Sequence, residues 1–297
     1  MVSEEHIREH IPVDPDAPFS LGRNINHDPK SAAYPFVPRR AVPIVSRDAW
    51  ASVLPILDQA SLGSCVPNTA VESLATGNFQ RDWVSSVDYN GRRIDLTDPV
   101  TAQSWITDTS DGLYHRVTLM DPYSGGWLPD DTGSDGTSMV NLFMELGMLE
   151  SFTHAFSGLP DVLQALNQGT VWMGSNWYDS MFWPNSEGIL EISPNATVSG
   201  GHQYLFTGKI DADRKLSEIR NHWRRDWGLD GYAWMPWNVK ERLLGEQGDA
   251  QILNWKVGAV PPFPPIEPSG CLPKFTHALA GRLSRMGDPS TRKPTVF

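Results

Sequence analysis

The chain has 297 residues, which is enough to bury a sizeable core in one large domain or two small ones. Its formal net charge of −11, from 24 basic and 35 acidic residues, argues against a nucleic-acid partner, because phosphate backbones require a basic surface. The 40% hydrophobic and 20% charged content is typical of a globular protein in water. No apolar run approaches the ~18 residues of a membrane span, and the charged start of the chain resembles no export signal, so we expect a cytoplasmic location without membrane contact.

Composition divides the chain into three parts. Residues 1–45 are rich in proline and lack periodic apolar positions, which predicts an extended N-terminal arm. Apolar anchors at Leu21, Ile25 and Tyr34 favour an arm that lies on the surface of the folded domain. Residues 46–258 carry the periodic patterns of a domain, and residues 259–297 form a Pro-rich tail that we expect to be flexible.

Helical patterns come first in the domain and strand patterns later, which predicts an α+β fold. Helices are expected after Cys65 as far as Gly77, within 98–119, from Ser138 to Leu146 and from Leu159 to Leu166. Strands are expected at 171–177, 201–209, 216–220, 232–236 and 251–257. The run from Asp130 to Asp135 lacks the spacing of a calcium loop, so it is interpreted as a solvated turn with a helix N-cap.

The first chemical motif surrounds Cys65, which follows Gly63 and Ser64 and lies six residues after Gln59. Apolar residues recur at helical spacing after Cys65, and Pro67 fits a first helical turn. Cys65 is therefore predicted at a helix N-terminus, where free N–H groups and the helix dipole favour a thiolate.

Two later segments supply the partners that a nucleophilic thiol requires. His202 follows two glycines and opens an apolar strand pattern, so it is the candidate base. Asn221 opens the segment Asn-His-Trp-Arg-Arg-Asp-Trp-Gly-Leu-Asp-Gly-Tyr and supplies a carboxamide to orient the imidazole. His222 is the nearest rival to His202, because it lies within this same segment.

The three motifs, in this chain order, resemble those of papain-like cysteine peptidases. The resemblance implies a helical left subdomain and a β-barrel-like right subdomain with the active-site cleft between them. It implies catalytic roles for Cys65 as nucleophile, His202 as acid and base, Asn221 as orienting group and Gln59 as oxyanion donor. Trp223 would shield the His–Asn hydrogen bond and, with the glycine-rich turn at Gly136, contact the substrate. The substrate is expected to be a peptide or protein, without metal or cofactor.

Several alternatives accompany this resemblance. The lead-in from Leu21 to Pro35 is similar to that of bacterial, notably actinobacterial, and phage members, and Leu62 replaces a disulfide cysteine of secreted members. With only Cys65 and Cys271 in the chain, a reducing compartment is expected, or a virion in the case of phage origin. A structural or binding protein of the same fold, such as a virion component, and amide ligation by the same acyl-enzyme are the competing functions, and oligomeric state is left open. We expect the full-length chain to be active without removal of the arm.

Overall fold

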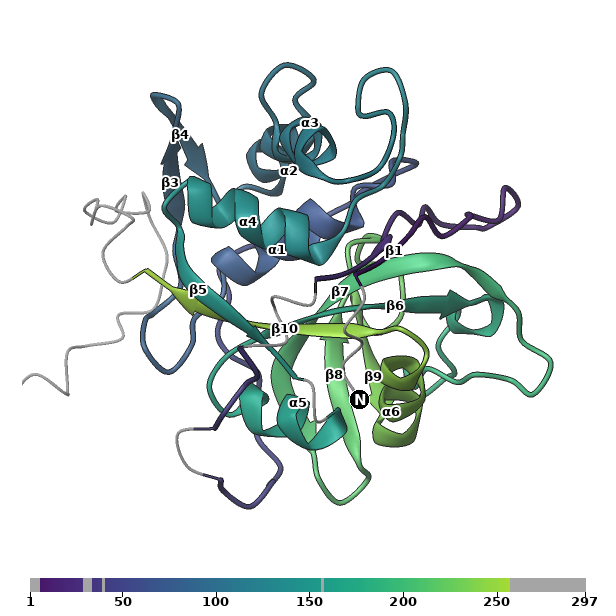
Figure 1. Ribbon diagram of the computed structural model, residues 1–297. Coiled ribbons are helices and arrows are strands. Elements are labelled where there is room, and N and C mark those ends of the chain that lie inside the picture. Colours follow the sequence, from purple (N-terminus) through teal and green to yellow (C-terminus); the bar gives the residue numbers. More distant parts are fainter. Residues whose placement is uncertain (1–5, 29–33, 39–40, 156–157, 257–297) are drawn as a thin grey trace, which may run out of the picture. The chain divides into compact units, whose positions relative to one another are not determined.

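The first four α-helices precede the six strands of the large sheet, as the hydrophobic periodicity predicts, whereas two short strand pairs lie before and among these helices. A computed structural model describes residues 6–28, 34–38, 41–155 and 158–256, and the predicted tail over 259–297 lies outside them. The α-helices of these residues are α1 (Cys65–Leu74), α2 (Pro99–Thr107), α3 (Leu113–Met120), α4 (Gly136–Glu145), α5 (Leu159–Leu166) and α6 (Trp237–Gly245), with one 3₁₀ turn, η2 (Asp179–Met181). Figure 1 shows α1–α4 above the large sheet and α5 and α6 below it.

Strand pairing in the second half produces one antiparallel sheet. Its strands lie in the order β5-β10-β6-β7-β8-β9, with β5 (Leu149–His154), β6 (Val171–Tyr178), β7 (Val198–Asp211), β8 (Leu216–Arg220), β9 (Tyr232–Pro236) and β10 (Asp249–Trp255). Among the described strands this sheet is open, with β5 and β9 at its edges, so the expected barrel-like closure is absent there. The fold is a mixed helix-and-sheet architecture, as predicted.

Local patterns located most elements, and the exceptions have identifiable causes. The helical pattern within 98–119 forms two helices, because Gly112 lies between them and packs its backbone against Asp108 and Trp105. The hairpin of β3 (Ser86–Tyr89) and β4 (Arg92–Asp95) was not predicted, and neither were β5 and α6. These elements are short or partly exposed, so their apolar periodicity is weak.

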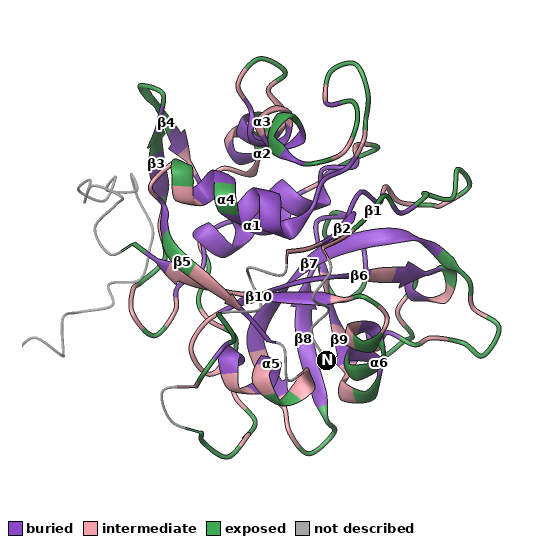
Figure 2. Cartoon of the chain, viewed as in Figure 1, coloured by how far each residue is buried: buried purple, intermediate pink, exposed green. Residues whose placement is uncertain are grey.

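Helix α1 forms the centre of the core. All ten of its residues are buried, and α1 packs against β7 of the sheet (Figure 2). A helix that is buried on every side must pack against partners all round, and its apolar neighbours include Trp105, Tyr114, Phe143, Trp172 and Leu205. This packing fixes the N-terminal end of α1, and with it Cys65, beside the large sheet.

The N-terminal arm is buried over residues 21–26, whereas the sequence predicts an arm that lies on the surface of the domain. Its strands β1 (Ile7–Glu9) and β2 (Ile25–His27) pair with each other, and the segment before β2 runs between the helices and the sheet (Figure 1). Residues 21–26 of that segment are buried. This stretch therefore belongs to the packed core of the described chain, because its backbone and side chains satisfy groups on both sides. Apart from Ile11 and Phe36, the other described residues up to position 45 are exposed or half-buried. No helix among the described residues is both long and apolar enough to span a bilayer.

Candidate active site

Cys65 is the first residue of α1, as predicted. Its N-cap Ser64 makes no capping hydrogen bond through its side chain, and the Cys65 side chain is fully buried. The backbone N–H groups of Gln203, Gly22 and Val66 favour its thiolate. The sulfur therefore lies at the junction of the helix, strand β7 and the N-terminal arm.

The predicted imidazole and carboxamide meet beside this junction. His202 on β7 and Asn221, which directly follows β8, are joined by a hydrogen bond of 2.9 Å between Nε2 and Oδ1. Trp223 stacks on the His202 ring with centroids 4.4 Å apart, and Trp177 meets that ring edge-on at 4.9 Å. The hydrogen bond is thus enclosed by indole rings, which exclude water and strengthen it. Within the described chain, the buried Nδ1 of His202 has no hydrogen-bond partner.

Gln59, six residues before Cys65, contacts both the Asn221 segment and the arm. Its backbone N–H donates to the carbonyl of His222 at 2.9 Å, which ties the Cys65 segment to the Asn221 segment. Its side-chain Nε2 donates to Leu62 O at 2.8 Å and to Ser20 O, in the arm, at 3.1 Å. The amide expected to stabilise an oxyanion is thus already bonded to a carbonyl oxygen of the arm.

A buried ionic cluster behind the site was not predicted. Glu72 of α1 lies 3.1 Å from Arg220 Nε and 3.5 Å from His222 Nδ1, and all three side chains are buried. Arg220 also donates to the carbonyls of Leu54 and Pro55. The charge of Arg220 and the contact with His222 lower the pKa of Glu72 despite its burial. The only sequence signal was a carboxylate on the apolar helix after Cys65.

The acidic turn before α4 divides into separate roles. Asp135 caps α4, as predicted, by accepting from Ser138 N at 2.8 Å, but it is buried, and burial raises its pKa to about 6. Asp131 accepts from Gly63 N at 2.9 Å and so holds the residues before Cys65. Gly136 begins α4, where any side chain would collide with Gln251. No group of metal-ligating residues occurs in the described part of the chain.

The arm fills the space between strand β7, which carries Gly201 and His202, and the turn before α4, which carries Ser134. Gly22 N and Arg23 N donate to Gly201 O at 3.0 and 2.9 Å. On the other side, Ser134 N donates to Gly22 O at 2.8 Å and Asn24 N donates to Ser134 O at 2.7 Å, which is parallel pairing. The backbone of the turn at 134, two residues before Gly136, therefore pairs with an extended strand across the site, and that strand belongs to the same chain.

Burial of both side chains changes the protonation of the pair. Desolvation outweighs the nearby N–H groups and raises the pKa of the Cys65 thiol to about 12. Burial and the neighbouring His222 hold the pKa of His202 well below its ordinary value, although its bond to Asn221 acts in the opposite direction. The helix N-terminus was expected to favour a thiolate, but in this arrangement both groups are neutral at pH 7 because burial dominates.

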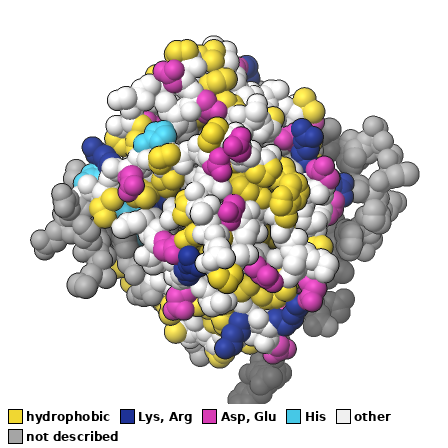
Figure 3. All heavy atoms as spheres, turned by 90° about the vertical axis from the view of Figure 1, so that its right-hand side faces the viewer, with side chains coloured by type: hydrophobic (Ala, Val, Ile, Leu, Met, Phe, Trp, Pro, Cys, Tyr) yellow, Lys and Arg dark blue, Asp and Glu magenta, His cyan; other side chains and the backbone are white. Residues whose placement is uncertain are grey.

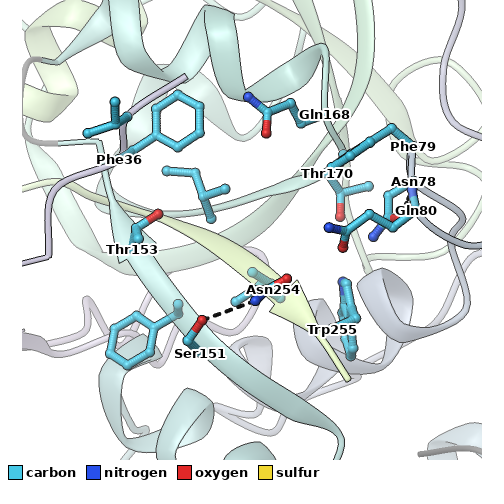
Figure 4. A pocket seen from close by; sticks show the side chains of 15 residues that line it. Phe36, Asn78, Phe79, Gln80, Ser151, Thr153, Gln168, Thr170, Asn254 and Trp255 are labelled. Carbon is cyan, nitrogen blue, oxygen red and sulfur yellow. Dashed lines mark hydrogen bonds between the residues drawn. The ribbon is translucent and has the colours of Figure 1, made fainter. Parts of the chain in front are cut away.

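Two surface features lie apart from this site. A pocket lined by residues such as Phe36, Phe79, Thr170 and Trp255 opens beside β5 and β10 (Figure 4), and none of the predicted site residues lines it. On the face shown in Figure 3, basic and acidic side chains are interspersed and form no basic patch. The candidate site is not an open pocket, because the arm fills it.

Comparisons with known proteins identify the fold. No family model and no curated protein sequence matches the chain. Among solved structures, xylellain, a cysteine protease from Xylella fastidiosa, matches with a TM-score of 0.53 and 15% identity over 85% of this chain and 99% of its own. Bromelain from Ananas comosus (TM-score 0.45, 11% identity, 72% and 100% covered) and procathepsin L 3 from Tenebrio molitor (0.48, 16%, 74% and 73%) match more weakly. The described chain has a papain-like fold.

Proposed function

We propose that this protein is a papain-like cysteine peptidase that hydrolyses peptide bonds through an acyl-enzyme on Cys65. The observation that carries the proposal is the hydrogen bond between His202 and Asn221, enclosed by Trp223, on the strand against which the Cys65 end of α1 packs. Such a set is what a thiol nucleophile needs: a base for its proton and a fixed ring orientation for that base.

The chemistry follows from the donors at the site. His202 takes the Cys65 proton, and the sulfur adds to the substrate carbonyl to form a tetrahedral oxyanion. The Cys65 backbone N–H and the Gln59 amide would stabilise that oxyanion, and one such donor is typically worth ~10²–10³ in rate. The imidazolium then protonates the leaving amine, which yields a thioester. Water attacks the thioester with His202 as base, which releases the carboxylic acid and restores the thiol.

The arm makes the full-length chain latent under this proposal. The N–H groups of Gly22 and Arg23 already donate to Gly201 O, and the Gln59 amide already donates to the Ser20 carbonyl. A substrate therefore cannot form hydrogen bonds with Gly201 O or the Gln59 amide until the arm leaves. This replaces our sequence-based expectation that the full-length chain is active as it stands. Displacement of the arm by substrate, or its proteolytic removal, would rehydrate Cys65 and His202 and bring the pKa values of the two groups closer together.

Labelling of the thiol tests the proposal. The full-length chain is incubated with a peptidyl electrophile before and after limited proteolysis of the arm, and the labelled cysteine is identified by peptide mapping. We expect labelling of Cys65 that increases on proteolysis, is lost in Cys65→Ala and His202→Ala, and persists in Cys271→Ser. Peptide hydrolysis should follow the same pattern. Labelling of Cys65 that is unaffected by His202→Ala would contradict a peptidase mechanism.

One observation favours a second function. Cys65 and His202 are both buried and neutral while the arm is in place, which suits a structural or binding protein that retains the fold without catalysis. In that case no proteolysed form would cleave peptides.

The Leu21–Pro35 lead-in supports a bacterial or phage-type origin for the proposed peptidase. Such a peptidase would act on peptide or protein substrates in the cytoplasm, or in a virion if the chain is of phage origin.

A further inference from the structure

The arm places one charged side chain in a pocket of the sheet. Arg23 lies opposite Ser134, and its side chain is completely buried. Its Nη2 forms an ion pair with Asp249 and donates to Gln247 O at 2.8 Å. A buried guanidinium is stable only where a carboxylate and other hydrogen-bond acceptors surround it. Asp249 and the carbonyl of Gln247 therefore form a site for a cation.

The pocket is built from one row across three strands. Asp249 of β10 pairs with Gly174 of β6, and Gly174 pairs with Gln203 of β7. Gly174 provides the space: a Cβ there would lie 2.5 Å from Asp249 Oδ1, 2.7 Å from Arg23 Nε and 2.9 Å from Gln203 Oε1. The same row thus supplies a carboxylate, an amide oxygen and the room for a planar group between them.

Arg23 uses this site incompletely. Within the described part of the chain, its Nε and Nη1 have no hydrogen-bond partner, and neither does the buried Gln203 Oε1. The arm runs parallel to the turn at Ser134, which constrains how the Arg23 side chain enters. Unpaired donors and an unpaired acceptor within one small cradle indicate that a guanidinium arriving on a different backbone could form more bonds there.

The charge of the pocket is also set for a cation. Gln251 donates its amide to Asp249 Oδ2, and Gln203 donates to Gln251 Oε1 at 3.3 Å, so the carboxylate is held in position by a chain of amides. Burial keeps the pKa of His27 below its ordinary value and lowers that of His154 to about 4. Both nearby histidines are therefore neutral at pH 7 and leave the Asp249 charge uncompensated when Arg23 withdraws.

We infer that the pocket of Asp249, Gly174 and Gln203 selects a basic side chain, arginine above lysine, in the substrate strand that replaces the arm. This inference rests on the proposed function and specifies its substrate class. The turn at Ser134 and Gly201 O fix the replacing backbone beside Cys65. The selected residue should therefore stand at one fixed position within three residues of the cleaved bond. Arginine is preferred over lysine because its planar fork can satisfy the carboxylate and the amide oxygen together.

The pocket can be tested first by ligand binding, without catalysis. In full-length Arg23→Ala the cation is removed and the cavity remains. We expect millimolar N-acetyl-arginine amide to raise the melting temperature of this variant, and the neutral isostere N-acetyl-citrulline amide to leave it unchanged. In Arg23→Ala/Asp249→Ala, where no unpaired charge is left to unfold the chain, neither ligand should act. Equal effects of the two ligands, or an effect that survives in the double variant, would overturn the inference.

Substrate profiling then tests the specificity. Full-length Arg23→Ala is given a mixed peptide library before and after limited proteolysis of the arm, and cleaved bonds are identified by mass spectrometry. We expect arginine at one fixed position near the cleaved bond, and a loss of roughly 30-fold or more in kcat/KM for such peptides in Arg23→Ala/Asp249→Asn. Cleavage with no basic preference would refute the inference while the peptidase stands. Arginine-dependent stabilisation without cleavage of any peptide would instead refute the peptidase and keep the cation pocket.

Discussion

The ring of Phe19 stacks on the indole of Trp223, with centroids 4.7 Å apart and ring planes 8° apart. Trp223 in turn stacks on the imidazole of His202. A side chain of the arm is thereby joined to the proposed base through one indole ring. The arm makes further contacts along the site. The Ser20 carbonyl accepts from Gln59, the N–H groups of Gly22 and Arg23 donate to Gly201 O, and the Arg23 side chain forms an ion pair with Asp249. The arm therefore stabilises the closed site through a series of separable interactions, and each can be weakened by itself.

Removing the Phe19 ring should loosen the closed arrangement. Phe19→Ala deletes an aromatic pair worth about 0.5–1.5 kcal/mol beyond the buried area, so the open state should become more populated. We expect alkylation of Cys65 by iodoacetamide at pH 8, followed by peptide mapping, to become about tenfold faster. Val13→Ala is the matched control, because Val13 belongs to the same arm but is 42% exposed. If both variants react like the parent chain, the arm is not held by this stack.

A methyl group at position 201 should displace the arm selectively. A Cβ on Gly201 would overlap the Arg23 carbonyl and lie 2.7 Å from Ile11, and both of these residues belong to the arm. Gly201→Ala should therefore expose the arm to trypsin and accelerate alkylation of Cys65. Gly245→Ala, where a Cβ meets nothing within 4 Å, is the control and should behave like the parent. An unchanged digestion pattern in Gly201→Ala would show that the arm adjusts without leaving.

The cluster behind the site should be a major contributor to stability. Glu72→Gln leaves the buried Arg220 without its countercharge, which we expect to lower the free energy of unfolding by about 3–5 kcal/mol. Urea denaturation measures this difference. Glu145→Gln, at the exposed end of α4, removes the same charge and should change stability by no more than about 0.5 kcal/mol. Similar losses in the two variants would mean that the ion pair contributes nothing particular.

Acid sensitivity should depend in part on His154. Burial lowers its pKa from 6.5 to about 4, so the unfolded chain binds the proton more readily than the folded chain. The stabilising contribution of neutral His154 to the free energy of unfolding is therefore present above pH 6.5 and is lost as the pH falls towards 4. Relative to His154→Gln, the parent chain should lose about 2 kcal/mol more stability between pH 7 and pH 5. Thermal or urea unfolding at the two pH values measures this difference.

Comparison with the variant isolates this one group. Burial raises the pKa of Asp121 to about 7 and that of Asp135 to about 6, and these shifts act in the opposite direction as the pH falls. Both carboxyl groups are present in parent and variant, so their contribution cancels in the difference. Parallel stability curves for the two chains would show that His154 is not responsible.

Local sequence determined the candidate site residues and most of the elements that carry them. The order Cys65, His202, Asn221 and the helix that begins at Cys65 could be predicted because each depends on a motif or a periodicity within about a dozen residues. The bounds of α5, β8 and β9 agree with the prediction for the same reason. The sequence could not determine the path of the arm, because a proline-rich segment has no apolar periodicity that would indicate which helix or strand it packs against.

Tertiary structure alone decided the state of the site. Arg23 meets Asp249 across 226 positions, and Arg220 meets Glu72 across 148, and nothing local predicts either pair. The protonation of Cys65 follows from the same long-range packing. Its place at a helix N-terminus and the N–H of Gly22 in the arm favour a thiolate, but burial of the side chain favours the neutral thiol, and burial is the larger effect. Local sequence identifies the candidate groups, whereas the packing of distant segments decides how deeply each group is buried and which charges lie beside it.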